Sequence, residues 1–245
     1  MPVFVNGGQP PREWRAQVKD FVRERYTHLI AAHAFPPGGR GRAREAGYPA
    51  AWVDALPERE AGAYCGCGYA LEGVDLGGVR LAVDLGCGAG LDARLLAGRL
   101  GGRGRVLALD FAPAMARRAR ETAGEGVAPL VGDIECLPLR DGAADLLLAN
   151  ASLNLTVDKA AALAEAARVL RPGGRLVARE MVREGPLPPE IARDPSAWNA
   201  SLGGVPEEGE WRAWLAQAGF AGVRISHHRP FAPVVAVRIE AVKPE

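Results

Sequence analysis

The sequence predicts an α/β fold in which a seven-stranded doubly wound sheet carries helices on both faces, preceded by a helical segment. Two observations lead to this prediction. From residue 81 onward, short apolar runs alternate with longer segments of helical period, which is typical of parallel βαβ units. The first run closes on Asp84-Leu85-Gly86-Cys87-Gly88-Ala89-Gly90, a glycine-rich turn of the kind that joins a buried strand to a helix.

The first third of the chain predicts a helical extension. Residues 11–34 carry apolar side chains at spacings of three and four, the pattern of an amphipathic helix. A short helix is expected over residues 48–56. We therefore expect residues 1–62 to form a helical lid and residues 63–245 to form the main domain.

Residues 35–47 lie between these two helices and combine proline and glycine with several charges. Such a composition is typical of an exposed, mobile loop. We expect this loop to close over the pocket when substrate binds.

The elements of the main domain follow from the alternation of apolar runs and helical periods. We expect strands at residues 81–85, 106–109, 129–131, 144–149, 175–180, 222–226 and 234–242. We expect helices at residues 91–100, 112–123, 159–170 and 210–218, with an insert over residues 182–209.

Composition limits the function classes. The 245 residues carry a net charge of +1 and no apolar run of membrane length, which disfavours a nucleic-acid or membrane partner. The four cysteines are too few and too unevenly spaced for a disulfide framework. These features predict a cytoplasmic protein with reduced thiols and give no oligomeric state.

The glycine-rich turn predicts a ligand held close to the backbone. Gly86, Gly88 and Gly90 leave no Cβ between the chain and a ligand, and free amides at the start of the next helix can face a carboxylate or a phosphate. Asp110 closes the second apolar run about 20 positions after Gly90, the distance at which such folds set an acid against ribose hydroxyls. The ligand is therefore expected to contain a nucleoside.

Polar residues that follow other apolar runs are expected at the same place, because ligands of open α/β sheets lie beyond the carboxyl ends of the strands. Asp133 is expected to accept from an adenine amine, with Ile134 and Met115 on the faces of the ring. Asp92 can reach an amino group or a ribose of the ligand, or it can simply favour the helix dipole. The expected cofactor-binding residues are Asp84, Gly86, Cys87, Gly88, Gly90, Asp92, Asp110, Phe111, Met115, Asp133, Ile134 and Asn150.

The spacing D-x-G-x-G-x-G resembles motif I of the class I methyltransferases, which have a Rossmann-like fold and bind S-adenosylmethionine. From about residue 17 to residue 226, the chain resembles the arsenite S-adenosylmethionine methyltransferase family. The segments specific to that family are Tyr64-Cys65-Gly66-Cys67-Gly68, Asn150-Ala151-Ser152-Leu153-Asn154-Leu155, and Trp198 with Leu202-Gly203-Gly204. The resemblance implies S-adenosylmethionine as cofactor, S-adenosylhomocysteine as product, and a metalloid or small-molecule acceptor.

In that family three thiolates hold trivalent arsenic, a soft centre that prefers sulfur ligands. The first thiol position of the family corresponds to Cys67, but the second falls on Ala151 and the third on Ser201. The acceptor site is therefore expected to be remodelled. Cys65 and Cys67 together with an external thiol can still capture a metalloid, or both can be small packing residues.

Methyl transfer needs no dedicated base, because the sulfonium is already an activated leaving group. We expect Cys67 and Tyr64 to act at the acceptor end and expect no bound metal. If the acceptor is a hydroxyl or a carbon acid, the candidate bases are His28, His33, His227, His228, Tyr64 and Glu180. The alternatives are a biosynthetic C-, O- or N-methyltransferase and a non-catalytic protein that binds S-adenosylmethionine.

Overall fold

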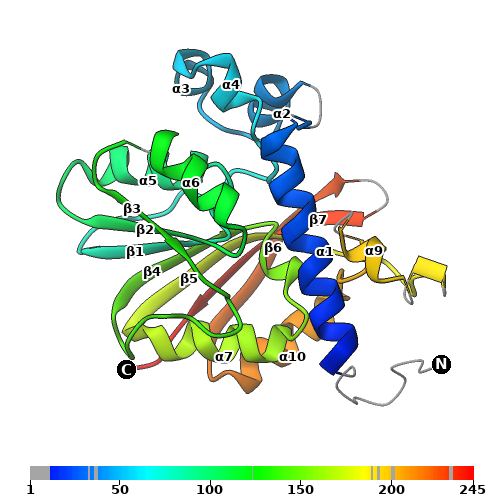
Figure 1. Ribbon diagram of the computed structural model, residues 1–245. Helices are drawn as coiled ribbons and strands as arrows, with labels where there is room; N and C mark the ends of the chain where they lie inside the picture. Colours follow the sequence, from blue (N-terminus) through cyan, green and yellow to red (C-terminus); the bar gives the residue numbers. More distant parts are fainter. Residues whose placement is uncertain are drawn as a thin grey trace.

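The centre of the structure is a seven-stranded sheet with the strand order β3-β2-β1-β4-β5-β7-β6 (Figure 1). This computed structural model describes residues 12–245 except residues 33, 36–37, 123, 189, 192–193, 200–201 and 232–233. The strands are β1 (Leu81–Leu85), β2 (Arg105–Asp110), β3 (Val127–Val131), β4 (Ala144–Asn150), β5 (Leu170–Val182), β6 (Ala221–Phe231) and β7 (Val234–Val242).

The first five strands pair in parallel, and β7 is antiparallel to both β5 and β6. In β1, Val83 pairs with Leu107 of β2 on one side and with Leu147 of β4 on the other. The carboxyl ends of β1, β2 and β4 therefore meet at one edge of the sheet. The predicted seven-stranded doubly wound sheet is confirmed.

Helices cover both faces of the sheet, as Figure 1 shows. Side chains of α5 (Leu91–Leu100) and α6 (Pro113–Thr122) pack on one face. Side chains of α7 (Lys159–Val169) and α10 (Glu208–Gln217) pack on the other, where Trp211 is fully buried. Successive strand residues point to opposite faces, so near-continuous apolar runs such as that of β1 are buried on both sides.

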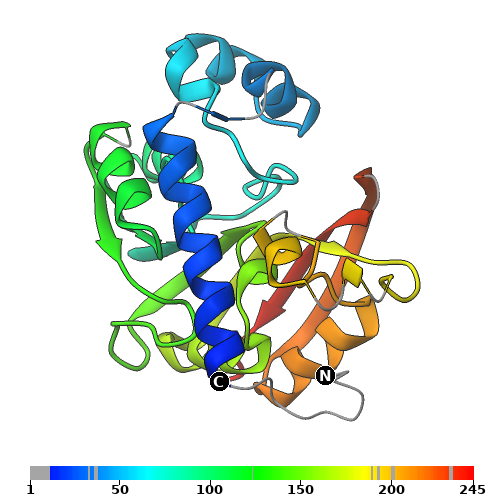
Figure 2. The ribbon, with the colours of Figure 1, turned by 45° about the vertical axis from the view of Figure 1, so that its right-hand side comes forward.

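The first described element of the N-terminal segment is α1 (Arg12–Ala31), a long helix that crosses the molecule beside the sheet (Figure 2). It contacts α6 and α9 (Pro195–Asn199). The rings of Trp14 and Trp198 meet edge to face, with centroids 5.1 Å apart. The remaining N-terminal helices are α2 (Gly39–Glu45), α3 (Ala50–Ala55) and α4 (Glu58–Ala61).

The prediction of an exposed, mobile loop over residues 35–47 is wrong for residues 39–45, which form α2. Ala43 of α2 is fully buried. The guanidinium of Arg40 donates to the carbonyls of Val53, Asp54 and Leu56. These long-range contacts stabilise a helix of only seven residues, which is too short to be stable in isolation.

Three other short elements were also not predicted. They are α4, α9 and the 3₁₀ turn η1 (Leu153–Leu155). None of the described helices is long and apolar enough to cross a membrane.

Candidate active site

The glycine-rich turn lies between β1 and α5. Gly86, Gly88 and Gly90 have φ values of 74°, 53° and 86°, in the left-handed region that glycine adopts without strain. A Cβ on Gly86 would lie 2.4 Å from the Cβ of Ser152, whereas a Cβ on Gly88 would meet no atom within 4 Å. The turn is therefore packed closely against the protein at Gly86 and open at Gly88.

A cavity opens in front of this turn, with about 1040 Å³ of free space when its mouth is included. That space is sufficient for a ligand of nucleoside size. Its walls come from α1, the turn before β1, the glycine-rich turn, and the segments that follow β2, β3 and β4. The structure thus brings to one cavity nearly all of the residues expected to bind the cofactor. Among them are Asp84, Gly86, Cys87, Gly88, Asp92, Asp110, Phe111, Met115, Asp133, Ile134 and Asn150. Gly90 is not in the lining and instead caps the start of α5.

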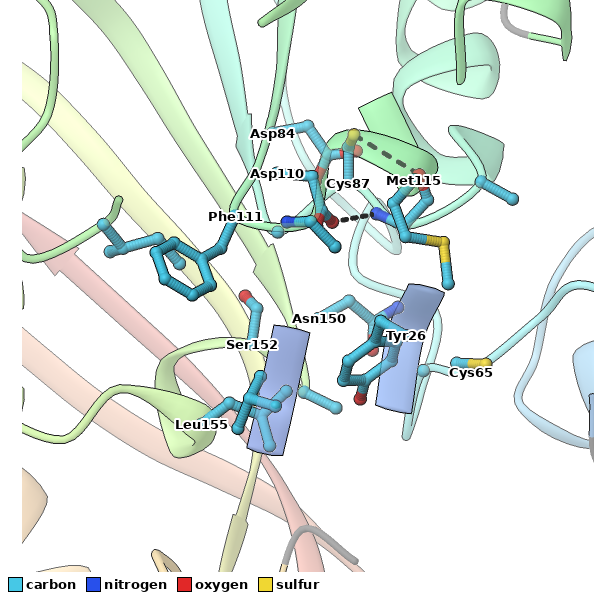
Figure 3. A pocket seen from close by; sticks show the side chains of 18 of the residues that line it. Tyr26, Cys65, Asp84, Cys87, Asp110, Phe111, Met115, Asn150, Ser152 and Leu155 are labelled. Carbon is cyan, nitrogen blue, oxygen red and sulfur yellow. Dashed lines mark hydrogen bonds between the residues drawn. The ribbon is translucent and has the colours of Figure 1, made fainter. Parts of the chain in front are cut away.

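Two groups of side chains occupy opposite ends of the cavity (Figure 3). Asp84, Asp110 and Met115 lie at one end, and Tyr26 and Leu155 lie at the other. The first end is acidic and the second is mostly apolar. The acidic end is therefore suited to the polar part of a bound ligand, and the apolar end to its apolar part or to a second ligand.

The acidic end contains three buried carboxylates, Asp84, Asp92 and Asp110. Burial raises the pKa of Asp84 well above its ordinary value, and the neighbouring carboxylates raise it further. Burial also raises the pKa of Asp110 to about 6, although the amides of Ala112 and Gly88 each donate to it at 2.8 Å. A cationic ligand would favour the ionised form of all three acids.

One carboxylate oxygen of Asp84 is left unpaired within the described part of the chain. Its side chain is only 1% exposed, and Oδ2 has no hydrogen bond among the described residues. A buried carboxylate oxygen left without a partner costs free energy unless a ligand satisfies it. Because Asp84 lines the cavity, this oxygen indicates a ligand with a hydrogen-bond donor.

Asp92 is held by two protein side chains. Its Oδ1 accepts from the hydroxyl of Tyr48 at 2.7 Å, and its Oδ2 accepts from Nδ2 of Asn150 at 2.8 Å. Burial raises the pKa of Asp92, while these two hydrogen bonds lower it. The sequence left two roles open for Asp92. The structure adds a third, because Asp92 joins α5 to Tyr48 and to Asn150.

The segment after β3 is tied to α1. Nζ of Lys19 lies 2.5 Å from Oδ2 of Asp133 and 2.8 Å from Oε2 of Glu135. Lys19 and Arg23 also lie above the ring of Phe111, at 6.0 Å and 5.3 Å from its centroid. Helix α1 therefore covers this part of the cavity.

The thiols before β1 lie in different surroundings. Cys65 lines the cavity, whereas Cys67 is 1% exposed in an apolar cluster that also contains Ala151 and Met181. Burial raises the pKa of Cys67 strongly and that of Cys65 to about 11, although Arg42 and Arg25 lower the latter. Both groups are therefore protonated thiols at neutral pH.

Ala151, where the resemblance predicts a family thiol, has an unusual backbone conformation. Its φ of 57° makes it the only described non-glycine residue in the left-handed region, and its side chain lines the cavity. The third family position, Ser201, lies outside the described residues. No group of three or more potential metal ligands occurs in the part of the chain that the structure describes.

The candidate bases are not gathered at the cavity. His28 is exposed, and His228 pairs with Glu208 at 2.7 Å. Glu180 is fully buried and accepts from the amides of Ser152, Leu153 and Asn154. His33 and the side chain of His227 lie outside the described residues. Tyr64 does line the cavity, and burial raises its pKa, so that the phenol stays protonated.

A family model described as a methyltransferase domain matches residues 81–219. The chain belongs to this family. The matched range runs from β1 through α10 and includes the glycine-rich turn, the acidic end of the cavity and the segment after β4. The methyltransferase fold is therefore established for the part of the chain that carries most of the cavity.

The chain is related to arsenite methyltransferases. It is 32% identical over 165 residues to the arsenite methyltransferase of Halobacterium salinarum, covering 66% of this chain and 42% of that protein. It is 31% identical over 196 residues to the one of Aquipseudomonas alcaligenes, covering 74% and 56%. The chain thus spans about half the length of these curated relatives.

The solved structure of an arsenic (III) S-adenosylmethionine methyltransferase from Chlamydomonas reinhardtii has a similar fold. The TM-score is 0.67 at 24% identity, and the match covers 86% of this chain and 74% of that one. The similarity therefore extends beyond the matched domain.

Sequence analysis did not identify several cavity residues of the methyltransferase domain and its extension. Lys19, Val22, Arg23 and Tyr26 of α1 line the cavity at spacings of three and four, so the helical period did contain a signal for Val22 and Tyr26. No pattern pointed to Lys19, or to Tyr48 as the partner of Asp92.

Proposed function

We propose that this chain is an S-adenosylmethionine-dependent methyltransferase related to the arsenite methyltransferases, with a remodelled acceptor site. The observation that carries the proposal is Oδ2 of Asp84, which is buried in the cavity with no partner among the described residues. The ammonium group of the cofactor is a suitable donor for it. The open space at Gly88 and the three buried acids also fit a cationic nucleoside.

The residues proposed to hold the cofactor are those expected from the sequence. Asp84 would receive the ammonium group, Asp110 the ribose hydroxyls, and Asp133 with Ile134 and Met115 the adenine. When bound, S-adenosylmethionine supplies a methyl group on a positively charged sulfur. The covering helix α1 and the apolar walls exclude water, which strengthens the electrostatic interactions inside the cavity.

The residues of the acceptor end favour a nucleophile that needs no proton removed. Tyr64 and Cys65 both have raised pKa values, and the remaining walls include Val22, Ala151 and Leu155. None of these groups is a strong base at neutral pH. A lone pair that is already available, on a metalloid or on sulfur, is the chemistry that this end supports best.

Tyr64, Cys65 and Cys67 are the proposed acceptor-site residues. Cys65 lines the cavity, and Cys67 lies two residues further along the same turn. Ala151 supplies no sulfur at the second family position. Capture of a trivalent metalloid would then use one or both of these thiols together with a small external thiol. Each As–S bond would replace an As–O bond of arsenite, and the thiol proton would leave with that oxygen as water.

The test is transfer of labelled methyl from S-adenosylmethionine to arsenite in the presence of glutathione. We expect methylated arsenic from the wild-type chain and a loss of at least tenfold in Cys65→Ser or Cys67→Ser. Cys136→Ser is the matched control, because Cys136 is exposed and outside the cavity lining. Absence of transfer to arsenite, with cofactor binding retained, would refute a metalloid acceptor.

That last outcome would favour a small organic acceptor. The specific observation in its favour is Ala151, an apolar side chain where the family resemblance implies a thiol. If no acceptor is turned over and the cofactor still binds, the chain is a non-catalytic cofactor-binding protein. Production of S-adenosylhomocysteine separates the two cases.

The proposed organisation assigns residues 1–62 to a lid and residues 63–245 to the methyltransferase domain. The ion pairs of Lys19 with Asp133 and Glu135 support the lid. A cytoplasmic location is part of the proposal and is supported by the four free cysteines.

A further inference from the structure

The side chain of Asn150 joins three segments that are far apart in the sequence. Its Nδ2 donates to Oδ2 of Asp92 and to the carbonyl of Gly68, each at 2.8 Å, and lies 3.0 Å from the hydroxyl oxygen of Tyr48. Its Oδ1 accepts from the amide of Cys67 at 3.0 Å. One amide thus connects α5, the N-terminal extension and the turn before β1.

Tyr48 completes this junction. Its hydroxyl donates to Oδ1 of Asp92 at 2.7 Å, so both oxygens of Asp92 accept from protein side chains. The Tyr48 ring is 3% exposed and packs against Tyr64 and Tyr69, with centroids 5.3 Å and 4.8 Å away. The side chain of Tyr48 therefore fixes both the Asp92 carboxylate and the ring of Tyr64, the residue before Cys65.

The turn at residues 64–68 is held closely against this junction. A Cβ on Gly66 would lie 2.5 Å from Oδ1 of Asn150, so no larger residue fits there without movement. Arg42 donates to the carbonyl of Tyr64 at 2.7 Å, and Arg229 donates to that of Cys67 at 3.2 Å. Side-chain donors from three elements thus restrain the turn.

We propose that Asn150 and Tyr48 are positioning residues that fix the turn at residues 64–68 at the distance from the cofactor end that methyl transfer requires. This inference rests on the proposed function, since it assigns the turn to the acceptor. A fully satisfied buried polar network is rigid. In-line transfer depends on alignment, and a displacement of about 1 Å can reduce the rate about 100-fold. The two side chains therefore act on the rate through the turn.

The kinetic test compares Tyr48→Phe and Asn150→Ala with Tyr69→Phe. Tyr69 packs on the same aromatic cluster, but its hydroxyl contacts only Arg99 among the described partners. With arsenite and glutathione as acceptor, we expect kcat to fall at least tenfold in the first two variants. In Tyr48→Phe the dissociation constant for S-adenosylmethionine should change less than threefold, because Tyr48 lies outside the cavity lining, and Tyr69→Phe should match the wild type. An unchanged kcat in the first two variants, or cofactor affinity lost in proportion to kcat in Tyr48→Phe, would overturn the proposal.

A second test does not depend on turnover. Iodoacetamide labelling without cofactor, followed by mass spectrometry, gives a separate rate for each cysteine. We expect Cys67 to be labelled at least ten times faster in Tyr48→Phe and Asn150→Ala than in the wild type, while Cys87 keeps its rate. Exposed Cys136 is the reference for reagent activity. Acceleration of Cys67 and Cys87 together would indicate general loosening and overturn the proposal, as would no acceleration at all.

These two tests separate the inference from the proposed function. A wild-type chain that transfers no methyl group refutes the proposed function. The labelling rates still decide whether Asn150 and Tyr48 hold the turn.

Discussion

Nζ of Lys19 lies 2.5 Å from a carboxylate oxygen of Asp133, which ties α1 to the segment that follows β3. Burial alone would lower the pKa of Lys19, but its hydrogen bonds to Asp133 and Glu135 raise it above the ordinary value. Lys19 is therefore a cation in the folded protein. Its ion pairs hold α1 over the end of the cavity proposed for adenine.

Replacing Lys19 with methionine should weaken this cover. Lys19 and Asp133 are partly exposed, so the contacts are worth about 0.5–1 kcal/mol. We expect the dissociation constant for S-adenosylmethionine to rise about two- to fivefold at low salt, chiefly through faster dissociation. Arg12→Met, at an exposed position of the same helix, should leave the constant unchanged. Equal effects of the two variants in stopped-flow measurements would contradict a specific role of Lys19.

Replacing Gly86 or Gly88 of the same turn with alanine should affect different properties, fold stability in the first case and cofactor binding in the second. Gly86→Ala would bring a methyl group against the Cβ of Ser152, and we expect it to destabilise the fold by at least about 2 kcal/mol. Gly88→Ala meets no protein atom and should fold, with about 1 kcal/mol of backbone strain. It should nevertheless lose most cofactor affinity. Normal binding by a folded Gly88→Ala variant would argue against the proposed site.

Ala151→Gly should stabilise the protein or leave its stability unchanged. The substitution removes about 1–2 kcal/mol of strain, which the left-handed conformation costs alanine. Against this gain, glycine loses about 0.5–1 kcal/mol more chain entropy on folding than alanine does. Ala149→Gly, two residues earlier in an extended and fully buried position, should lower the free energy of unfolding by about 1 kcal/mol or more. Urea denaturation measures both, and equal losses would contradict strain at Ala151.

Glu180→Gln should flatten the pH dependence of stability. Burial raises the pKa of Glu180 to about 7, although three backbone amides donate to it and lower the pKa. The folded state then binds this proton more tightly than the unfolded chain. The proton on Glu180 therefore contributes fully to the free energy of unfolding below about pH 4.5. This contribution is lost as the pH rises through about 7, a change of about 3 kcal/mol. Lys159, whose pKa burial lowers to about 8, remains protonated over this range.

The measurement is the free energy of unfolding from pH 4.5 to pH 7.5. The wild type should lose stability as the pH rises, and Glu180→Gln should lose less. Parallel curves for the two proteins would show that Glu180 ionises in the folded state as it does in the unfolded chain.

The sheet and the acidic end of the cavity could be predicted from sequence because their signals are local. Each parallel strand is an apolar run. Asp84 lies near the end of one run, two residues before Gly86, and Asp110 ends another, three residues before the start of α6. The carboxyl-edge rule for α/β sheets then brings these residues together without further information.

The contacts of the N-terminal segment could not be predicted, because they depend on long-range partners. Tyr48 looks like an ordinary core aromatic in the sequence, and only the fold sets its hydroxyl on Asp92, 44 positions away. The helix α2 depends on carbonyls that Arg40 reaches 13 to 16 positions later. The different surroundings of Cys65 and Cys67 likewise arise from packing of the turn against Asn150.

The most direct test of the central claim is titration of the purified chain with S-adenosylmethionine by calorimetry, beside Asp84→Asn. Asp141→Asn, an exposed acid outside the cavity lining, is the control. We expect one site per chain, affinity at least tenfold weaker in Asp84→Asn, and an unchanged control. Because the variant removes a buried acid with a raised pKa, its ligand-free form should be at least as stable as the wild type. No binding by the wild type, or equal binding by Asp84→Asn, would contradict the claim.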